Sequence, residues 1–244
     1  MNLLLVDPEE LADDGTCVVR DRRAVHLRGV LGATVGGQVR AGVVGGGLGR
    51  AVLLADDGAA ITLRLALTEP ASLALPIELV LAIPRPKAIA RVIETAAAFG
   101  VARVELTNAW RVDKSYLASP KLLPDALALA ARLGAEQGAT THVPPIAIHR
   151  RLMALLDARG SGPDGAVRLI AHPGAPPIEA AVTGAARPIV LAIGPEGGWI
   201  AREVETFAAR GFQPASLGTA ILRVESAVAA ALGQLVLLAR LRGT

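Results

Sequence analysis

Aromatic residues make up only 2% of this 244-residue chain, and Cys17 is its single cysteine. One cysteine excludes an intramolecular disulfide and any zinc site built on a cluster of cysteines. The longest apolar stretch, residues 226–239, is interrupted by Gln234 and is short for a membrane span. The N-terminus has no basic segment followed by a long apolar core, so no secretory signal is expected. These absences predict a cytoplasmic protein without a membrane or metal partner.

Aliphatic residues must form most of the hydrophobic core, since 52% of the chain is hydrophobic and little of that is aromatic. A core of Ala, Leu, Val and Ile is typical of a globular rather than a disordered protein. The length is enough for one large domain or for a small and a medium one. A net charge of +3 and a pI of about 9.6 permit a polyanionic partner without requiring one.

The pattern of apolar residues and turns changes near residue 70. Residues 1–70 hold short strand-like runs at 2–6, 36–44, 50–55 and 59–67, separated by Gly- and Asp-rich turns, and a helix-like segment at 22–31. This pattern predicts a small β barrel or sandwich. Residues 68–76 are expected to form a linker. Strand-like and helix-like segments then alternate over residues 71–244. This alternation predicts an α/β domain with a mostly parallel sheet covered on both faces.

A glycine-rich turn, GPEGG at 194–198, follows the apolar run IVLAI. Behind it, Ile200, Val204 and Phe207 recur at helical spacing. Turns between a strand's carboxyl end and a helix are where open α/β sheets bind ligands, and glycine lets the backbone approach a ligand closely. Taken alone, the turn is better explained as an ordinary tight connection in which the helix dipole favours Glu196.

Two further loops, HPG at 172–174 and LGTAILRVESA at 217–227, also follow strand-like segments. In this order and spacing, HPG, IGPEGG and LGTAILRVESA closely resemble the motifs of the ribosomal small subunit RNA methyltransferase E family. The segments HLRGVLG (26–32), IPRPKAIARVIETAAAFGV (83–101), WRVDKSY (110–116) and GAEQG (134–138) extend the resemblance over nearly the whole chain.

The resemblance implies both a fold and an activity. The fold would be α/β, with a small N-terminal PUA/OB-like β-barrel for RNA binding (1–70) and a C-terminal SPOUT-type trefoil-knot methyltransferase domain (71–244). The activity would be S-adenosyl-L-methionine-dependent methylation of N3 of a uridine in 16S ribosomal RNA, free or in the small ribosomal subunit. The residues implied to bind the cofactor are His172, Pro173, Gly174, Ile193, Gly194, Pro195, Glu196, Gly197, Gly198, Leu217, Gly218, Ile221, Leu222 and Arg223.

The candidate catalytic residues are Arg223, Glu225 and Glu196. N3 methylation requires the ring imide proton to leave, and a cation beside the uracil carbonyls stabilises the negative charge that develops. Arg223 suits that role or the binding of a phosphate. Glu225 could orient Arg223 or accept the proton, and Glu196 is a second candidate base. The alternative is that Arg223 and Glu225 form a surface ion pair that contributes little.

Candidate RNA-binding cations lie in both parts of the chain: Arg22, Arg23, Arg28, Arg85, Lys87, Arg111 and Lys114. The resembled family usually has arginine where this chain has Gly32, Thr140 and Ala220, and phosphate contacts dominate nucleic-acid affinity. Two alternatives therefore stay open: an RNA-binding protein of this fold without methyl transfer, and a methyltransferase for a different RNA nucleotide. A phosphate-binding nucleotidase is a distant third, because the turn lacks a lysine.

The closing helix-like segment, residues 224–241, is apolar nearly all round. A helix of that kind needs cover on both sides, and only one side can pack on the sheet of its own chain. We therefore expect a homodimer built on this helix. The alternative is that the N-terminal barrel covers the helix within one chain.

Overall fold

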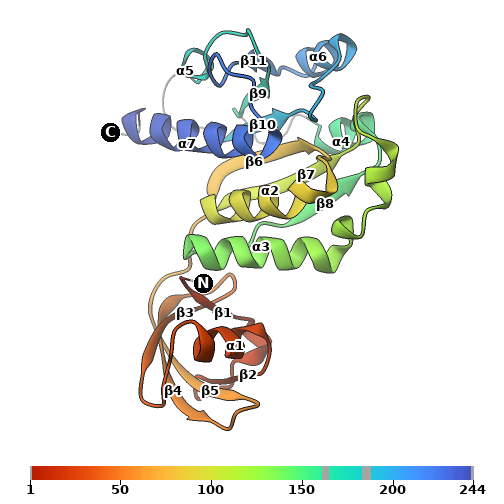
Figure 1. Cartoon of the computed structure of the whole chain (residues 1–244). Helices are drawn as coiled ribbons and strands as arrows, with labels where there is room; N and C mark the ends of the chain where they lie inside the picture. The colour runs from red at the N-terminus through yellow and green to blue at the C-terminus, as the bar shows by residue number, and fades with distance from the viewer. Residues whose placement is uncertain (1, 161–164, 183–187, 243–244) are drawn as a thin grey trace. The chain divides into compact units, whose positions relative to one another are not determined.

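The computed structural model describes residues 2–160, 165–182 and 188–242, and it divides into two compact units (Figure 1). The first unit comprises residues 1–73 and 132–143, and the second comprises residues 74–131 and 144–244. The sequence pattern grouped residues 132–143 with the C-terminal part. In the structure their packing places them in the first unit.

The first unit holds a five-stranded sheet in the order β1-β3-β4-β5-β2. β1 and β3 are parallel, and the other neighbours are antiparallel. Its elements are β1 (Leu4–Val6), the 3-10 turn η1 (Pro8–Glu10), β2 (Thr16–Val19), α1 (Arg22–Gly29), β3 (Gln38–Val43), β4 (Leu48–Asp56) and β5 (Ile61–Glu69). The predicted strands and helix are confirmed here, whereas β2 was missed.

Both faces of β1 are buried, which explains how residues 132–143 join this unit. Successive side chains of a strand point to opposite faces. Leu4 and Val6 enter the main core with Leu27 of α1. Leu3 and Leu5 enter a second cluster with Ala135, from the last turns of α3 (Pro124–Gly138). The segment 132–143 therefore completes the hydrophobic core of the first unit.

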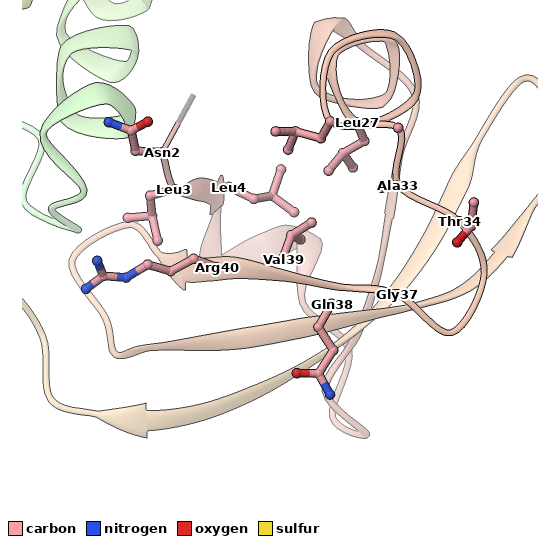
Figure 2. Close-up of a pocket in the computed structure, with 12 residues that line it drawn as sticks. Asn2, Leu3, Leu4, Leu27, Ala33, Thr34, Gly37, Gln38, Val39 and Arg40 are labelled. Atoms are coloured by element: carbon pink, nitrogen blue, oxygen red, sulfur yellow. The ribbon is translucent and has the colours of Figure 1, made fainter.

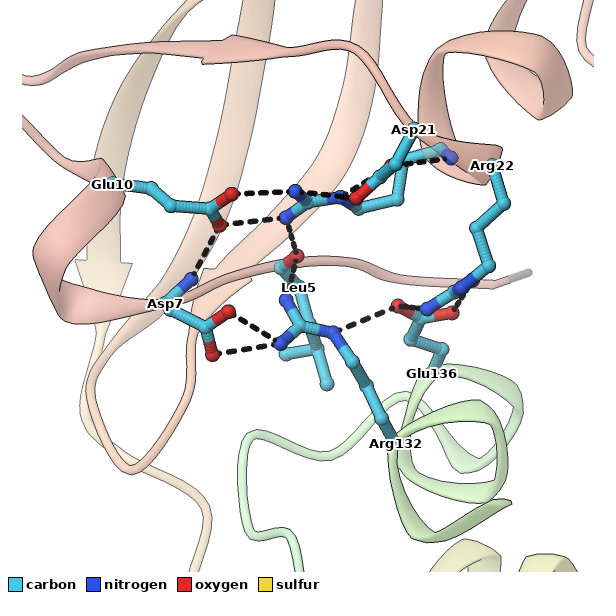
Figure 3. Close-up of polar contacts among 8 residues, drawn as sticks. Leu5, Asp7, Glu10, Asp21, Arg22, Arg132 and Glu136 are labelled. Atoms are coloured by element: carbon cyan, nitrogen blue, oxygen red, sulfur yellow. Dashed lines mark hydrogen bonds and ion pairs between the residues drawn. The ribbon is translucent and has the colours of Figure 1, made fainter. Parts of the chain in front are cut away.

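A network of ion pairs ties the same elements together (Figure 3). Arg23 is 4% exposed, and its guanidinium donates to both carboxylate oxygens of Glu10 at 2.6 and 2.7 Å and to Asp21. Arg23 and Arg132 also both donate to the carbonyl oxygen of Leu5, at 2.9 and 2.7 Å. The Arg23 guanidinium lowers the pKa of the Glu10 carboxyl. The buried Arg23 and the half-buried Arg132 are therefore committed to contacts inside the unit.

The second unit is built on a six-stranded, entirely parallel sheet in the order β11-β9-β10-β6-β7-β8. The predicted parallel α/β sheet is thus confirmed. The strands are β6 (Leu75–Ala82), β7 (Val101–Thr107), β8 (Ile146–His149), β9 (Val167–Ala171), β10 (Ile189–Ile193) and β11 (Gln213–Ala215). All five residues of central β10 are buried, as expected for a strand covered on both faces.

The helices that accompany this sheet are α2 (Pro86–Phe99), α3 (Pro124–Gly138), α4 (Leu152–Arg159), α5 (Ile178–Ala181), α6 (Ala201–Ala208) and α7 (Val224–Arg242), with 3-10 turns η2 (Lys114–Ala118) and η3 (Pro120–Leu122). α2 begins at Pro86 and ends at Gly100, whose φ of 75° is the left-handed conformation that glycine adopts readily. Its apolar face packs against β7 and α7.

α7 is the longest helix described and, by length and hydropathy alone, could cross a membrane. Its buried side chains include Val228, Ala231, Leu232 and Leu235, and it packs against α2 and β10, as a core helix does. Ala230 and Val236 are each half-buried, and Leu237 is 45% exposed. One apolar side of α7 therefore lies on its own unit, and part of the other side is open.

Candidate functional site

The candidate site lies where three parallel strands end at one edge of the sheet. β9 leads into His172 and Pro173, β10 leads into the turn at 194–198, and β11 leads into the loop at 217–222. β9 lies between β11 and β10 in the sheet, and all three strands run in the same direction. The carboxyl ends of parallel strands meet at one edge, so this is the position at which open α/β sheets bind ligands.

The three loops line one cavity of about 350 Å³. Twelve of the residues expected to bind a cofactor line it: His172, Pro173, Ile193, Gly194, Pro195, Glu196, Gly197, Gly198, Leu217, Gly218, Ile221 and Leu222. Two others do not: Gly174 and the exposed Arg223 lie outside its lining. The cavity also includes Arg111, Ala171, Trp199, Ala220, Val224 and Ala227, which the motifs did not assign to a cofactor.

The GPEGG turn owes its shape to its glycines and to Trp199. Gly198 donates its N–H to the carbonyl of Pro195 at 2.8 Å and adopts a φ of 71°, a conformation that L side chains rarely adopt. A Cβ on Gly194 would stand 3.2 Å from the Trp199 indole. That indole is buried against Phe207, with ring centroids 4.9 Å apart, and its Nε1 is buried without a hydrogen-bond partner. A buried donor in the cavity lining favours a ligand with an acceptor group.

Arg85 connects two of the candidate catalytic acids. Its backbone N–H donates to Glu196 Oε1 at 3.0 Å, and its Nη2 donates to Glu225 Oε1 at 3.2 Å. Glu225 Oε2 is buried and has no hydrogen-bond partner, and neither does Arg85 Nε. The sequence motifs placed Arg85 on the RNA surface. In the structure it is the cation between two carboxylates, with polar atoms still available to a ligand.

The side chain of Glu225 contacts Arg85, whereas the sequence suggested Arg223 as its partner. Glu225 forms its ion pair with Arg85. A hydrogen bond from its own backbone N–H at the start of α7, and then the Arg85 side chain, lower the pKa of the Glu225 carboxyl, and Arg223 contributes only through its charge. The lowered pKa keeps Glu225 anionic at neutral pH. Glu225 is therefore a better partner for a cation than an acceptor for a proton.

Glu203 joins two walls of the cavity and was not assigned from the sequence. This carboxylate on α6 is 9% exposed and accepts from the backbone N–H of Ile200 at 3.0 Å and of Trp110 at 2.8 Å. Nearby, Arg111 donates to the carbonyl of Gly197 at 2.5 Å. The turn after β7 is thus attached both to the start of α6 and to the GPEGG turn. An acid three residues after Ile200, at a helix start, was the signal available in the sequence.

His172 also lies at the cavity, with a defined orientation. Its Nδ1 is 2.8 Å from the carbonyl oxygen of Pro173. A carbonyl only accepts, so Nδ1 carries the proton in this hydrogen bond. The neutral ring then offers Nε2 as an acceptor.

Three of the predicted RNA-binding cations are engaged inside the first unit. Arg22 pairs with both oxygens of the buried Glu136 at 2.7 Å, Arg28 pairs with Asp56 at 2.6 Å, and Arg23 is buried as described above. Because each guanidinium already meets a carboxylate, its charge is largely neutralised before any phosphate arrives. Lys87, Arg111 and Lys114, in the second unit, are exposed.

A second cavity, of about 510 Å³, lies in the first unit (Figure 2). Leu4, Leu27 and Val39 gather on its inner side, and Gln38 and Arg40 of β3 also line it. Gly32 lines it too, with a φ of 56°. Gly32 is one of the positions at which the sequence departs from the resembled family's usual arginine, and its left-handed backbone conformation is one that glycine adopts readily.

The sheet, the three strand-end loops and the cavity are those of a ligand-binding α/β protein. Residues 71–236 match the family described as RNA methyltransferase domain, and because this stretch is more than half of the chain, the chain belongs to that family. It is 28% identical to the ribosomal RNA small subunit methyltransferase E of Treponema pallidum, over 95% of this chain and 89% of that protein. It is 29% identical to the protein of the same name from Synechocystis, over 95% of this chain and 76% of that protein.

The structure also resembles a solved one. The ribosomal RNA small subunit methyltransferase E of Neisseria gonorrhoeae, bound to S-adenosyl methionine, superposes with a TM-score of 0.79. The two chains are 22% identical, and the match covers 98% of each. At this identity the likeness is one of fold, and it extends over nearly all of the α/β architecture described above.

Proposed function

We propose that this chain transfers a methyl group from S-adenosyl-L-methionine to N3 of a uridine in the 16S ribosomal RNA of the small subunit. Membership of the RNA methyltransferase family and the names of its relatives support the reaction class and the RNA. The observation that carries the proposal is the single cavity at which the three motif loops meet. A volume of about 350 Å³ lies within the range of small-molecule sites, about 300–1,000 Å³.

The chemistry of the lining fits S-adenosyl-L-methionine, which supplies, when bound, a methyl group on a positively charged sulfur. Ile193, Leu217 and Leu222 offer apolar walls, and the glycine turn offers backbone groups that can meet the edge of an adenine. Glu196 in the lining offers a negative charge to the sulfonium or amino group. The unpartnered Nε1 of Trp199 offers a donor to the cofactor's oxygens or ring nitrogens.

Around this cavity, the roles of the charged residues follow from their contacts. Arg223 is exposed directly after the third loop, where a cation can stabilise the charge that develops on the uracil carbonyls or hold a phosphate. Glu225 holds Arg85 in place and supports Arg223 through its charge. Glu196 is the remaining candidate base, since its carboxylate both lines the cavity and contacts the backbone of Arg85.

The proposal also covers the domain organisation, the RNA-binding surface, the oligomeric state and the cellular location. We assign residues 1–70 to a PUA/OB-like RNA-binding barrel and residues 71–244 to a SPOUT-type domain whose three loops form a trefoil knot. The exposed Lys87, Arg111 and Lys114 supply the cationic surface of the second unit. The partly open face of α7 supports a homodimer. The cytoplasm, where ribosomal RNA is found, is the proposed location.

The decisive experiment uses small ribosomal subunits and free 16S RNA from a strain that lacks the gene for this chain. Each is incubated with the purified protein and the cofactor, and nucleosides from the digested RNA are identified by mass spectrometry. We expect 3-methyluridine at one position, which also stops reverse transcription because N3 lies on the pairing edge of the base. A different methylated nucleoside would change the target. RNA binding without any transfer would leave an RNA-binding protein of this fold.

A further inference from the structure

Trp110 is the aromatic side chain that the fold leaves open to solvent. The chain has only six aromatic residues. Trp199, Phe207 and Phe212 are buried, and Phe99 and Tyr116 are half-buried, whereas Trp110 is 79% exposed. Isolated exposed apolar residues are common on proteins, so exposure alone assigns nothing. The contacts of the Trp110 backbone and the position of Trp110 beside the cavity are what indicate a function for its side chain.

The backbone of Trp110 is held rigidly while its ring is presented outward. Trp110 and Arg111 are the two central residues of a turn in which Val112 donates to the carbonyl of Ala109 at 3.1 Å. Both ends of the turn are buried, and the N–H of Trp110 itself is held by the buried Glu203. A Trp side chain has only two rotatable angles, so little conformational freedom is lost when it binds a flat partner.

The turn also adjoins the cavity of the proposed methyl-transfer site. Arg111, the next residue, lines that cavity and donates to Gly197 O in the GPEGG turn. Trp110 therefore lies one residue along the chain from the lining of that cavity. The exposed Lys114 follows in the same segment. The Asp113 carboxylate, between Arg111 and Lys114 in the sequence, accepts a hydrogen bond from the backbone N–H of Ser115 at 2.9 Å. The local surface therefore combines an aromatic face with cations, which is typical of sites for single-stranded nucleic acid.

The proposed reaction supplies the ligand for such a face. N3 of uridine lies on the base's pairing edge, so the target base must be unpaired to enter a cavity. A base withdrawn from a stack leaves its neighbours without a stacking partner, and proteins that bind RNA in this state stack the free bases on aromatic side chains. We infer that Trp110 is a stacking platform for a nucleotide base next to the methylated uridine. This inference rests on the proposed function and adds a residue that positions the RNA.

The fluorescence of Trp110 gives the first test, because it does not depend on methyl transfer. The chain has two tryptophans, and the difference between the parent and Trp110→Phe isolates the signal of Trp110. In the free protein, acrylamide should quench this signal strongly, since the ring is exposed. Adding unmethylated small-subunit RNA should shield it. A signal already shielded in the free protein would place Trp110 in a contact with a second copy of the chain and overturn the inference.

Affinity and kinetics give the second test. Trp110→Leu keeps an apolar side chain without an aromatic face, and it should weaken RNA binding and raise KM for RNA by about ten-fold or more. Trp110→Phe should retain most of the affinity. Leu123→Ala, at another exposed apolar position of the same unit, is the matched control and should change neither quantity. The calorimetric affinity for S-adenosyl-L-methionine should stay within two-fold in every variant.

The outcomes separate this inference from the proposed function. If the parent methylates the RNA while Trp110→Leu matches it in KM and RNA affinity, the stacking role is wrong and the methyltransferase stands. If the parent neither binds nor methylates small-subunit RNA, the proposed function fails and the inference falls with it. Weakening by Leu, rescue by Phe and shielding by RNA together would establish the platform.

Discussion

Replacing Glu203 with alanine tests how the two walls of the cavity are joined. The change removes the acceptor of two backbone N–H groups, those of Trp110 and Ile200. Hydrogen bonds to a charged group contribute about 1.5–3 kcal/mol each, and the loss leaves two part-buried donors without their acceptor. Taking the lower value for each, we expect a destabilisation of about 3 kcal/mol. Glu203→Gln keeps one acceptor oxygen and should lose about half as much.

Thermal unfolding followed by circular dichroism measures the effect. In a protein of this size, 1 kcal/mol corresponds to roughly 2–4 °C in Tm, so Glu203→Ala should melt about 6–12 °C below the parent. Glu205→Ala removes an exposed carboxylate from the same helix and is the matched control, with a change expected within about 0.5 kcal/mol. Calorimetry should also show weaker cofactor binding for Glu203→Ala, because Trp199 and Arg111 lose their common support. Equal melting temperatures for the two alanine variants would refute this reasoning.

Three further predictions concern other parts of the molecule. Gly197→Val places a Cβ 3.0 Å from Cδ of Arg111 and should abolish cofactor binding in calorimetry by displacing the Arg111 side chain from the cavity lining. An affinity equal to the parent's would mean that the turn does not hold the cofactor. Arg223→Ala should lower kcat about 100-fold, as removal of a charge-stabilising donor does, while the cofactor affinity stays near that of the parent. Arg202→Ala, at an exposed position of α6, is the control, and equal losses of kcat and cofactor affinity for Arg223→Ala would place Arg223 in the cofactor site. Leu237→Asp, at an exposed position of α7, should convert the dimer into a monomer. Light scattering should then show the mass of one 25.0 kDa chain in place of twice that mass. A parent protein that is already monomeric would contradict the dimer.

A fifth prediction follows from the depressed pKa of Glu10. Its folded pKa lies below the ordinary value of 4.5, so its contribution to the free energy of unfolding is complete above that pH and is lost as pH falls through the folded value. The urea concentration at the midpoint of unfolding should therefore fall as the pH is lowered below 4.5. Glu10→Gln should be less stable than the parent at pH 7 and should show a smaller drop. If the urea midpoints of the parent and of Glu10→Gln fell equally with pH, Glu10 would not be the cause of the loss of stability in acid.

The elements that could be predicted from the sequence are those whose local pattern is strong. β10 is a continuous apolar run that ends in glycines, and α2 has Pro86 at its start and Gly100 at its end. The three motif loops could likewise be placed at one sheet edge, because parallel strands carry them there. Short β2 and β8 were missed, as were α4 and four-residue α5, because segments of this length show too few periods of a pattern.

The contacts between side chains were the less predictable part. Arg223 and Glu225 are two residues apart at a helix start, a spacing at which side chains do not face each other, so proximity in sequence was misleading. Glu225 instead meets Arg85, 140 residues earlier in the chain. The basic residues Arg22, Arg23 and Arg28 look like an RNA surface in the sequence. Their partners Glu136, Glu10 and Asp56 are determined by the tertiary fold.

The inclusion of residues 132–143 in the first unit has a consequence for how the chain is synthesised. When residue 73 has left the ribosome, Leu3 and Leu5 still lack Ala135, and the carbonyl of Leu5 still lacks Arg132. None of the six strands of the parallel sheet has been made by then, because the first of them, β6, begins at Leu75. The first unit can therefore reach its final packing only after about 70 further residues have been made, which takes several seconds at the usual rate of synthesis. During that interval Leu3 and Leu5 lack the apolar cover that Ala135 provides in the folded unit.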